Sequence, residues 1–149
     1  MKNFLFLASL IFLSACETAP PEDYAEWPGV HYSVEGIIKA FDHVAPGGGI
    51  RGKSANGREI YSKYHPPSGD IYANATTAKV RSYTKLAILG DRRPYVLQVS
   101  FIIEDRDDDG NYTVTQRDQV RAKKILRDLR KFLATRPDKD NFIDDFRPF

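Results

Sequence analysis

The sequence has few of the features that stabilise many small folds or that mark a known type of catalytic site. Its 149 residues include one cysteine, one methionine and one tryptophan. A single cysteine excludes an intrachain disulfide and a cluster of thiolate metal ligands. The histidines His31, His43 and His65 are far apart and form no His-Glu-x-x-His pattern, and no Gly-x-Ser-x-Gly motif occurs. An apolar core must therefore hold the fold, and no local motif of catalysis is present.

Charge of one sign is not in excess either. The chain has 22 lysines and arginines and 20 aspartates and glutamates, a formal net charge of +2. So small a net charge gives no global field that would attract a nucleic acid. We therefore expect no nucleic-acid partner.

The most continuous apolar run lies near the N-terminus. Residues 4–13 follow a lysine and are almost entirely apolar. About 20 apolar residues are needed to span a bilayer, so this run is too short to do so. It leads into Leu13-Ser14-Ala15-Cys16, an aliphatic residue, two small residues and the cysteine. The order of positive, apolar and small residues is typical of a secretory signal, and its end resembles the lipobox of bacterial lipoproteins.

This resemblance implies an anchored protein. Residues 1–15 would be a signal peptide, and Cys16 would carry several acyl chains, which together give stable membrane binding. Residue 17 is Glu17 rather than the aspartate that favours inner-membrane retention, so the resemblance implies an outer-membrane lipoprotein facing the periplasm. The alternative is a buried N-terminal helix or strand with a chance cysteine, because free cysteines are often buried.

The segment after the cysteine is expected to separate the domain from the membrane. Residues 17–29 contain three prolines and four acidic residues, with little apolar periodicity. Such a composition favours an extended chain. We therefore predict a lipidated cysteine with a tether over 16–29 and a single domain over 30–149.

Hydrophobic periodicity within the domain predicts an α+β fold. Apolar residues recur at helical spacing in two segments and alternate in the region between them. The clearest strand places Tyr95, Leu97, Val99, Phe101 and Ile103 on one face, which we expect to face the core. Short connections favour mostly antiparallel pairing. We expect a helix at 33–45, four strands at 59–65, 79–89, 95–104 and 112–115, and a helix at 116–135, with both helices on one sheet face.

An acidic run resembles half of a calcium-binding loop. Asp105, Asp107 and Asp109 alternate before Gly110, as in the first half of an EF-hand loop. The twelfth position of that loop would be Gln116 instead of a bidentate glutamate. An acidic hairpin turn explains the same residues, because Asp and Gly favour tight turns. We expect no cofactor, with calcium kept as the alternative.

The C-terminal helix is expected to carry a basic face. Arg121, Lys124, Arg127 and Lys131 lie away from its apolar stripe and could meet lipid phosphates or another anionic envelope component. The alternative is an ordinary solvated helix face.

The C-terminal tail is predicted to be a structural clasp. Apolar side chains such as Phe146 would pack on the domain, since disordered ends are usually poor in them. Asp144 and Asp145 would pair with Arg92 and Arg93. The alternative is a partner-binding peptide that is free in the isolated domain.

The function expected from these features is that of a membrane-anchored, non-catalytic accessory or interaction lipoprotein of the bacterial cell envelope. Its partners would be the membrane, through the lipid, and an envelope protein or anionic envelope component. The alternative is an envelope hydrolase or ligand-binding enzyme whose site is assembled from dispersed carboxylates such as Asp70 and Glu104, which no local motif would reveal.

Overall fold

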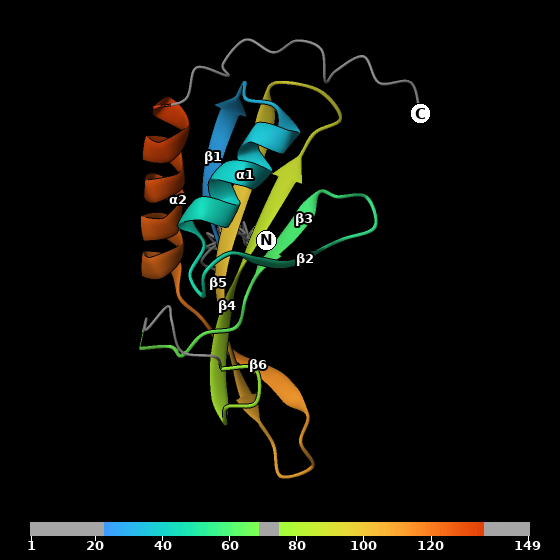
Figure 1. The fold of residues 1–149 in the computed structure, drawn as a ribbon, viewed down its shortest axis with the longest axis vertical. Coiled ribbons are helices and arrows are strands. Elements are labelled where there is room, and N and C mark those ends of the chain that lie inside the picture. The colour runs from blue at the N-terminus through green and yellow to red at the C-terminus, as the bar shows by residue number, and fades with distance from the viewer. Residues whose placement is uncertain (1–22, 69–74, 136–149) are drawn as a thin grey trace, which may run out of the picture.

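One long strand, β5, is the centre of the structure. The computed structural model describes residues 23–68 and 75–135, which form two helices and an antiparallel sheet of six strands (Figure 1). The α+β class predicted from the sequence is confirmed, with six strands in place of the four expected. The elements are β1 Ala25–Val30, α1 Val34–Val44, β2 Ile50–Lys53, β3 Glu59–Ser62, β4 Val80–Leu89, β5 Tyr95–Arg106, β6 Tyr112–Arg117 and α2 Gln119–Ala134.

Strand β5 pairs with neighbours on both of its edges. On one edge it pairs with β4 along that strand's whole length, from Leu89 opposite Val96 to Val80 opposite Asp105. On the other edge it pairs first with β1 and then with β6. Strands β3 and β2 continue the sheet beyond β4. The β5–β6 hairpin therefore extends past the helices (Figure 1).

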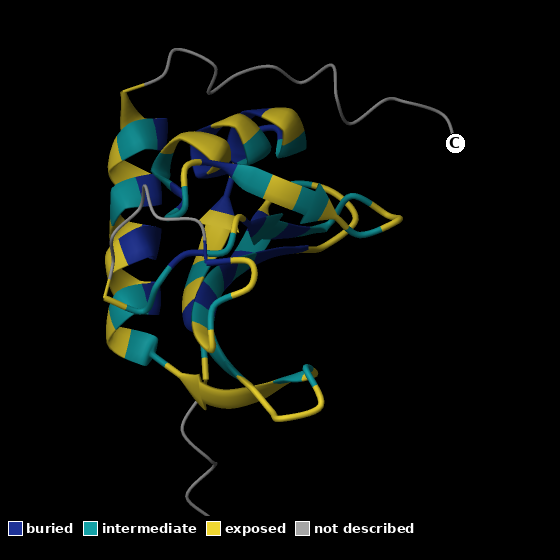
Figure 2. Ribbon diagram, turned by 60° about the horizontal axis from the view of Figure 1, so that its bottom comes forward, coloured by how far each residue is buried: buried dark blue, intermediate teal, exposed yellow. Residues whose placement is uncertain are grey.

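The core lies between the sheet and the two helices. Both helices lie on one face of the sheet, and the buried side of α2 faces it (Figure 2). Helix α2 contacts β1, β5 and α1. The predicted core side of β5 is confirmed, because four of its five residues are buried and Ile103 packs partly against them. Fully buried side chains of the core include Ile37, Phe41, Ile60, Leu86, Leu97, Val99, Leu129 and Leu133.

Both helices begin at residues that the sequence marks as caps. The hydroxyl of Ser33 accepts a hydrogen bond from the Gly36 amide at 3.0 Å, and the carboxylate of Asp118 accepts one from the Arg121 amide at 3.0 Å. Each bond satisfies an amide that has no partner within its helix. None of the described helices is both long and apolar enough to cross a bilayer.

Strand β1 occupies part of the expected tether. Residues from Ala25 onward pair with β5, and Ala25 and Val30 are buried against the core. The register shifts between Trp27 and Val30, where Pro28 lies. Proline is accepted at an edge or an irregularity of a sheet, so this segment pairs in spite of its loop-like composition.

Strand β2 was also not predicted, because it is short and follows a glycine turn. Gly47, Gly48 and Gly49 all have positive φ, at 83°, 77° and 114°. A Cβ atom at Gly47 would lie 2.8 Å from the carbonyl oxygen of Lys63. Only glycine fits there, and the turn that these residues form brings β2 back alongside β3.

Truncation of Leu129 tests whether α2 is part of this core. Leu129 is fully buried and Arg127 is exposed on the same helix. We expect Leu129→Ala to lower the free energy of unfolding by about 2 to 5 kcal/mol, because a cavity replaces packed methyl groups. Arg127→Ala should change it by less than about 0.5 kcal/mol. Denaturant unfolding measures both, and equal losses would contradict this packing.

Candidate functional site

The sheet face opposite the helices carries a group of tyrosines and arginines. We call Tyr61, Tyr64, Tyr83, Tyr112, Arg51 and Arg81 the tyrosine–arginine layer. Side chains alternate along a strand, so Tyr83 of β4 points away from the core that buried Thr84 and Leu86 face. The rings of Tyr64 and Tyr83 are 5.7 Å apart and meet edge to face. The helices leave this face uncovered (Figure 2).

Arg81 holds one half of the layer together. Its guanidinium lies 3.6 Å from the ring centre of Tyr64 and 3.3 Å from that of Tyr112. Its Nε donates to the carboxylate of Glu104 at 2.8 Å, and both side chains are only 11% and 12% exposed. The charge of Arg81 is therefore neutralised within the protein, and its role is to hold the two rings in place.

Arg51 differs from Arg81 in having no acidic partner among residues 23–68 and 75–135. It stacks over Tyr64 at 4.0 Å, and the rings of Tyr83 and Tyr61 lie 5.4 and 5.9 Å away. It also donates to the hydroxyl of Tyr64. In the described part of the chain no carboxylate forms an ion pair with Arg51. Arg51 is also exposed to solvent. Its guanidinium is therefore oriented by aromatic rings and still available to an anion.

Two tyrosines of this layer, Tyr61 and Tyr83, have a pKa raised above the ordinary value. Tyr61 donates to Glu59 at 2.7 Å, and this hydrogen bond raises the pKa of Tyr61. Burial, followed by the charge of Glu104, raises the pKa of Tyr83. Hydrogen bonds from Lys85 and Tyr61 lower the pKa of Glu59. Tyr61 and Tyr83 therefore present neutral rings beside the charged pair of Glu59 and Lys85.

A second feature is a groove of about 500 Å³ between β1 and α2. Three cations line it, those of Lys123, Arg127 and Arg130, and the guanidinium of Arg130 lies 4.8 Å from the ring centre of Trp27. Neither Lys123 nor Arg127 is in an ion pair within the described residues. We call this the β1–α2 groove. It is lined by Tyr24, Ala25, Glu26, Gln119, Lys123, Leu126, Arg127 and Arg130.

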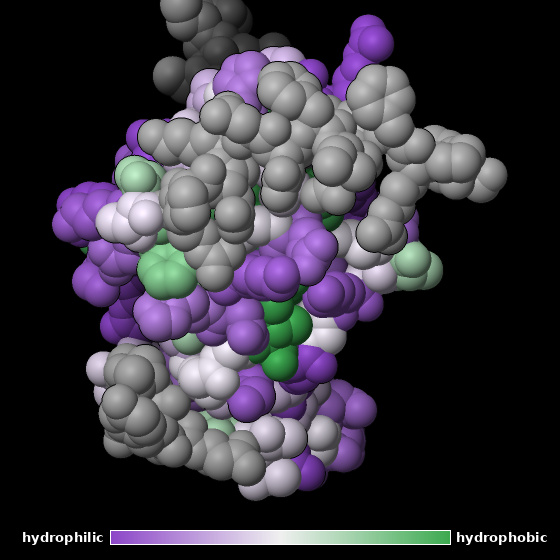
Figure 3. Space-filling view, turned by 45° about the horizontal axis from the view of Figure 1, so that its top comes forward, coloured by the Kyte–Doolittle hydropathy of each residue, from purple (hydrophilic) through white to green (hydrophobic). Residues whose placement is uncertain are grey.

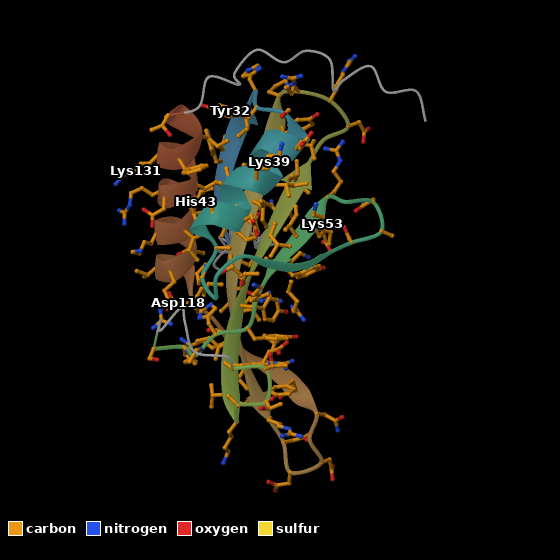
Figure 4. The ribbon with its side chains drawn as sticks, viewed as in Figure 1. Tyr32, Lys39, His43, Lys53, Asp118 and Lys131 are labelled. Carbon is orange, nitrogen blue, oxygen red and sulfur yellow. The ribbon has the colours of Figure 1, made fainter. Side chains whose placement is uncertain are left out.

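The basic face predicted for α2 is divided between different roles. Arg121 donates to the carbonyl of Pro67 and pairs with Asp118 at 3.2 Å. Lys124 pairs with Asp128 at 3.2 Å. Of the four predicted residues, Arg127 alone lines the groove. Lys131 is exposed on the outer side of the helix (Figure 4). Lys123 and Arg130, which complete the groove, were not among them.

The acidic run forms the turn between β5 and β6. Asp105 is the next to last residue of β5, and Asp107 and Asp109 belong to the turn. A carboxylate oxygen of Asp107 accepts the amide of Asn111 at 2.7 Å, so the hairpin reading accounts for this side chain. Among the residues that the structure describes, no group of three acidic or histidine side chains could hold a metal ion. The calcium site stays an untested alternative.

Several other predicted residues lie where the structure gives no test. Cys16, Asp70 and the tail residues Asp144, Asp145 and Phe146 are outside the described residues. Arg92 is exposed, and Arg93 donates to the carbonyl of His31 at 3.0 Å. The clasp therefore stays a prediction.

One buried pair resembles part of a hydrolase site but lacks its essentials. The hydroxyl of Ser82 lies 3.1 Å from Nδ1 of His65, and both residues are at most 1% exposed. The same hydroxyl donates to the carbonyl of His65 at 2.9 Å, and Nε2 has no partner among the described residues. A nucleophile needs access to its substrate and a base oriented by a third group. The pair is therefore structural: it joins the segment after β3, which contains His65, to strand β4.

Burial of His65 makes stability depend on pH. Burial, with a smaller contribution from the charge of Arg121, lowers the pKa of His65 below its ordinary value. When the pH falls below about 6.5, the unfolded chain takes up this proton before the folded one does, so stability decreases. We expect His65→Gln to lose less stability than the natural chain between pH 7 and pH 5. Denaturant unfolding at both pH values measures this, with exposed His31→Gln as control; identical pH dependence in all three proteins would contradict it.

The tyrosine–arginine layer and the β1–α2 groove both combine aromatic rings with cations. Glu104, which the alternative enzyme prediction placed in a carboxylate site, is paired with Arg81. The surface seen in Figure 3 is mostly hydrophilic, with isolated apolar side chains. On the described part of that face, hydrophilic side chains therefore predominate. No protein-family model, no curated protein and no solved structure matches the chain.

Proposed function

We propose that this chain is a membrane-anchored, non-catalytic interaction lipoprotein of the bacterial cell envelope. Cys16 carries the lipid, and the tyrosine–arginine layer binds a partner protein. The lipobox at Leu13-Ser14-Ala15-Cys16 supports the anchor. The partner-binding role rests on the contacts of the uncovered sheet face.

The observation that carries the proposal is the placement of Arg51. Its guanidinium is held over tyrosine rings, lies on the uncovered face and has no ion pair within the described residues. Tyrosine and arginine are the residues that most often dominate the binding energy of protein interfaces. Rings held in place by Arg81 also lose little freedom when a partner binds. A partner that presents a carboxylate to Arg51 would neutralise the charge of its guanidinium.

The same face has the form of an interface and not of a reaction site. Charged side chains near the layer, such as Glu59 and Lys85, already pair with each other at 2.5 Å. A rim of paired charges around aromatic side chains is the common organisation of a protein interface. The layer supplies surface and one unpaired cation, but no nucleophile beside a base.

Substitution of Cys16 tests the anchor. We expect Cys16→Ala to abolish labelling with a radioactive fatty acid, because the thiol is the site of lipid attachment. The unlabelled chain should also fail to float with vesicles after detergent removal. Ser14→Gly, which keeps a small residue before the cysteine, should leave labelling intact. Unchanged labelling of Cys16→Ala would overturn the lipoprotein proposal.

Site-directed photo-crosslinking tests the layer. Ser100 lies opposite Lys85 on the uncovered face, and Lys39 lies on α1, on the other side of the sheet. We expect a photoreactive amino acid at Ser100 to form one specific adduct in living cells, and the same group at Lys39 to form none. Arg51→Glu should reduce the Ser100 adduct about tenfold or more, as loss of a central arginine commonly does. Lys53→Glu, an equal change of charge on the same strand, should reduce it little. An adduct that is insensitive to Arg51→Glu would contradict this role for the layer.

A further inference from the structure

The β1–α2 groove lies beside the point where the chain leaves the described domain toward the proposed anchor. Tyr24 and Ala25 line it, and Asp23 is the first described residue. Cys16 lies seven positions before Asp23 in the sequence. A chain of that length spans at most about 25 Å, so the membrane that holds the lipid is always within that reach of the groove.

The charge of the groove is complementary to a membrane surface. Lys123, Arg127 and Arg130 contribute three cations from one face of α2, and each of these residues is exposed. The groove has one carboxylate, that of Glu26, and it accepts a hydrogen bond from Gln98 at 3.0 Å. The groove is therefore net positive. Phosphate groups of anionic lipids attract such clusters, and each basic side chain near the surface strengthens binding about fivefold.

The groove also combines its cations with aromatic side chains. The ring of Trp27 lies under Arg130, and Tyr24 lines the groove. Tryptophan and tyrosine have an apolar body and a polar edge, and both are enriched where protein meets the headgroup layer. Aromatic side chains beside cations, at the end of a lipid tether, match the composition of that layer.

We propose that the β1–α2 groove binds the headgroup phosphates of anionic phospholipids in the membrane that holds Cys16. This inference rests on the proposed anchor and adds an orientation to it. Docking at the groove directs β1 and α2 toward the membrane. The tyrosine–arginine layer, on the opposite face of the sheet from the helices, then stays accessible to a partner.

The chain contains its own probe of this contact. Trp27 is the single tryptophan in the sequence, so its fluorescence reports on the groove without a label. The lipidated full-length protein would be reconstituted into vesicles that contain a phospholipid with a nitroxide on its headgroup. One set of vesicles is phosphatidylcholine, and the other contains 30% phosphatidylglycerol. We expect at least twofold greater quenching of Trp27 in the anionic vesicles.

Charge variants assign that quenching to the groove. Lys123→Gln with Arg127→Gln should shift the equilibrium from docked to undocked by about 25-fold and remove the excess quenching. Lys123→Glu with Arg127→Glu should do the same more strongly. The matched control is Lys53→Glu with Lys63→Glu, two exposed lysines on β2 and after β3; β2 is the edge strand of the sheet opposite β1 and is remote from α2 (Figure 4). This control should keep the excess.

The two proposals fail in different readouts. Flotation of the protein with both kinds of vesicle measures the anchor alone. If the protein floats but quenching is equal in neutral and anionic vesicles, or persists in both groove variants, another occupant fills the groove and this inference is overturned. If the protein does not float with either vesicle, the anchor fails, and the membrane-binding role of the groove fails with it.

Discussion

The unequal coverage of the two sheet faces is the constraint on which the rest of the structure depends. Strand β5 is central in the sheet. It pairs with β4 along one edge and with β1 and β6 along the other. Its inward side chains, such as Leu97 and Val99, are buried against the core. Its outward side chains, such as Ser100 and Glu104, stay on a face without a helix. Burial on one side therefore leaves the other side free to be shaped by function.

Each face uses aromatic and basic residues in its own way. On the uncovered face, Arg81 is buried in a pair with Glu104 and holds the rings of Tyr64 and Tyr112. Arg51 stacks on the same cluster, and no described carboxylate pairs with it. On the helix side, Arg130 stacks on Trp27 at the border of a basic groove. Arginine is suited to both roles, since its planar group can stack on rings and also donate two parallel hydrogen bonds to one anion.

Much of the fold could be predicted from the sequence because several segments have strong periodicity. The alternation from Tyr95 to Ile103 identified the core side of β5, and helical spacing identified the apolar stripes of both helices. Strands β1 and β2 could not be predicted in this way. Pro28 interrupts β1, and β2 is four residues long and contains Gly52. Their pairing depends on partners that are distant in sequence.

The candidate sites could be predicted only in part, for a related reason. Helical periodicity shows which residues of α2 leave the core, but not which neighbours they meet. Arg121 donates a hydrogen bond to a backbone carbonyl, and Lys124 pairs with an aspartate. Lys123 and Arg130 instead line the β1–α2 groove. The residues of the tyrosine–arginine layer lie on four strands and a connecting segment, so no local sequence motif predicts it. Alternation of Arg81, Tyr83 and Lys85 opposite the core side of β4 was the one signal in the sequence that pointed to it.

The central claim is that one sheet face stabilises the fold and the other is available for binding. The most direct test is denaturant unfolding of Leu86→Ala and Tyr83→Ala, two residues of β4 on opposite faces. Leu86→Ala should lower the free energy of unfolding by about 2 to 5 kcal/mol. Tyr83→Ala should lower it by about 0.5 to 1.5 kcal/mol, the contribution of an aromatic pair near the surface. A loss for Tyr83→Ala as large as that for Leu86→Ala would make the layer a second core and would contradict the account.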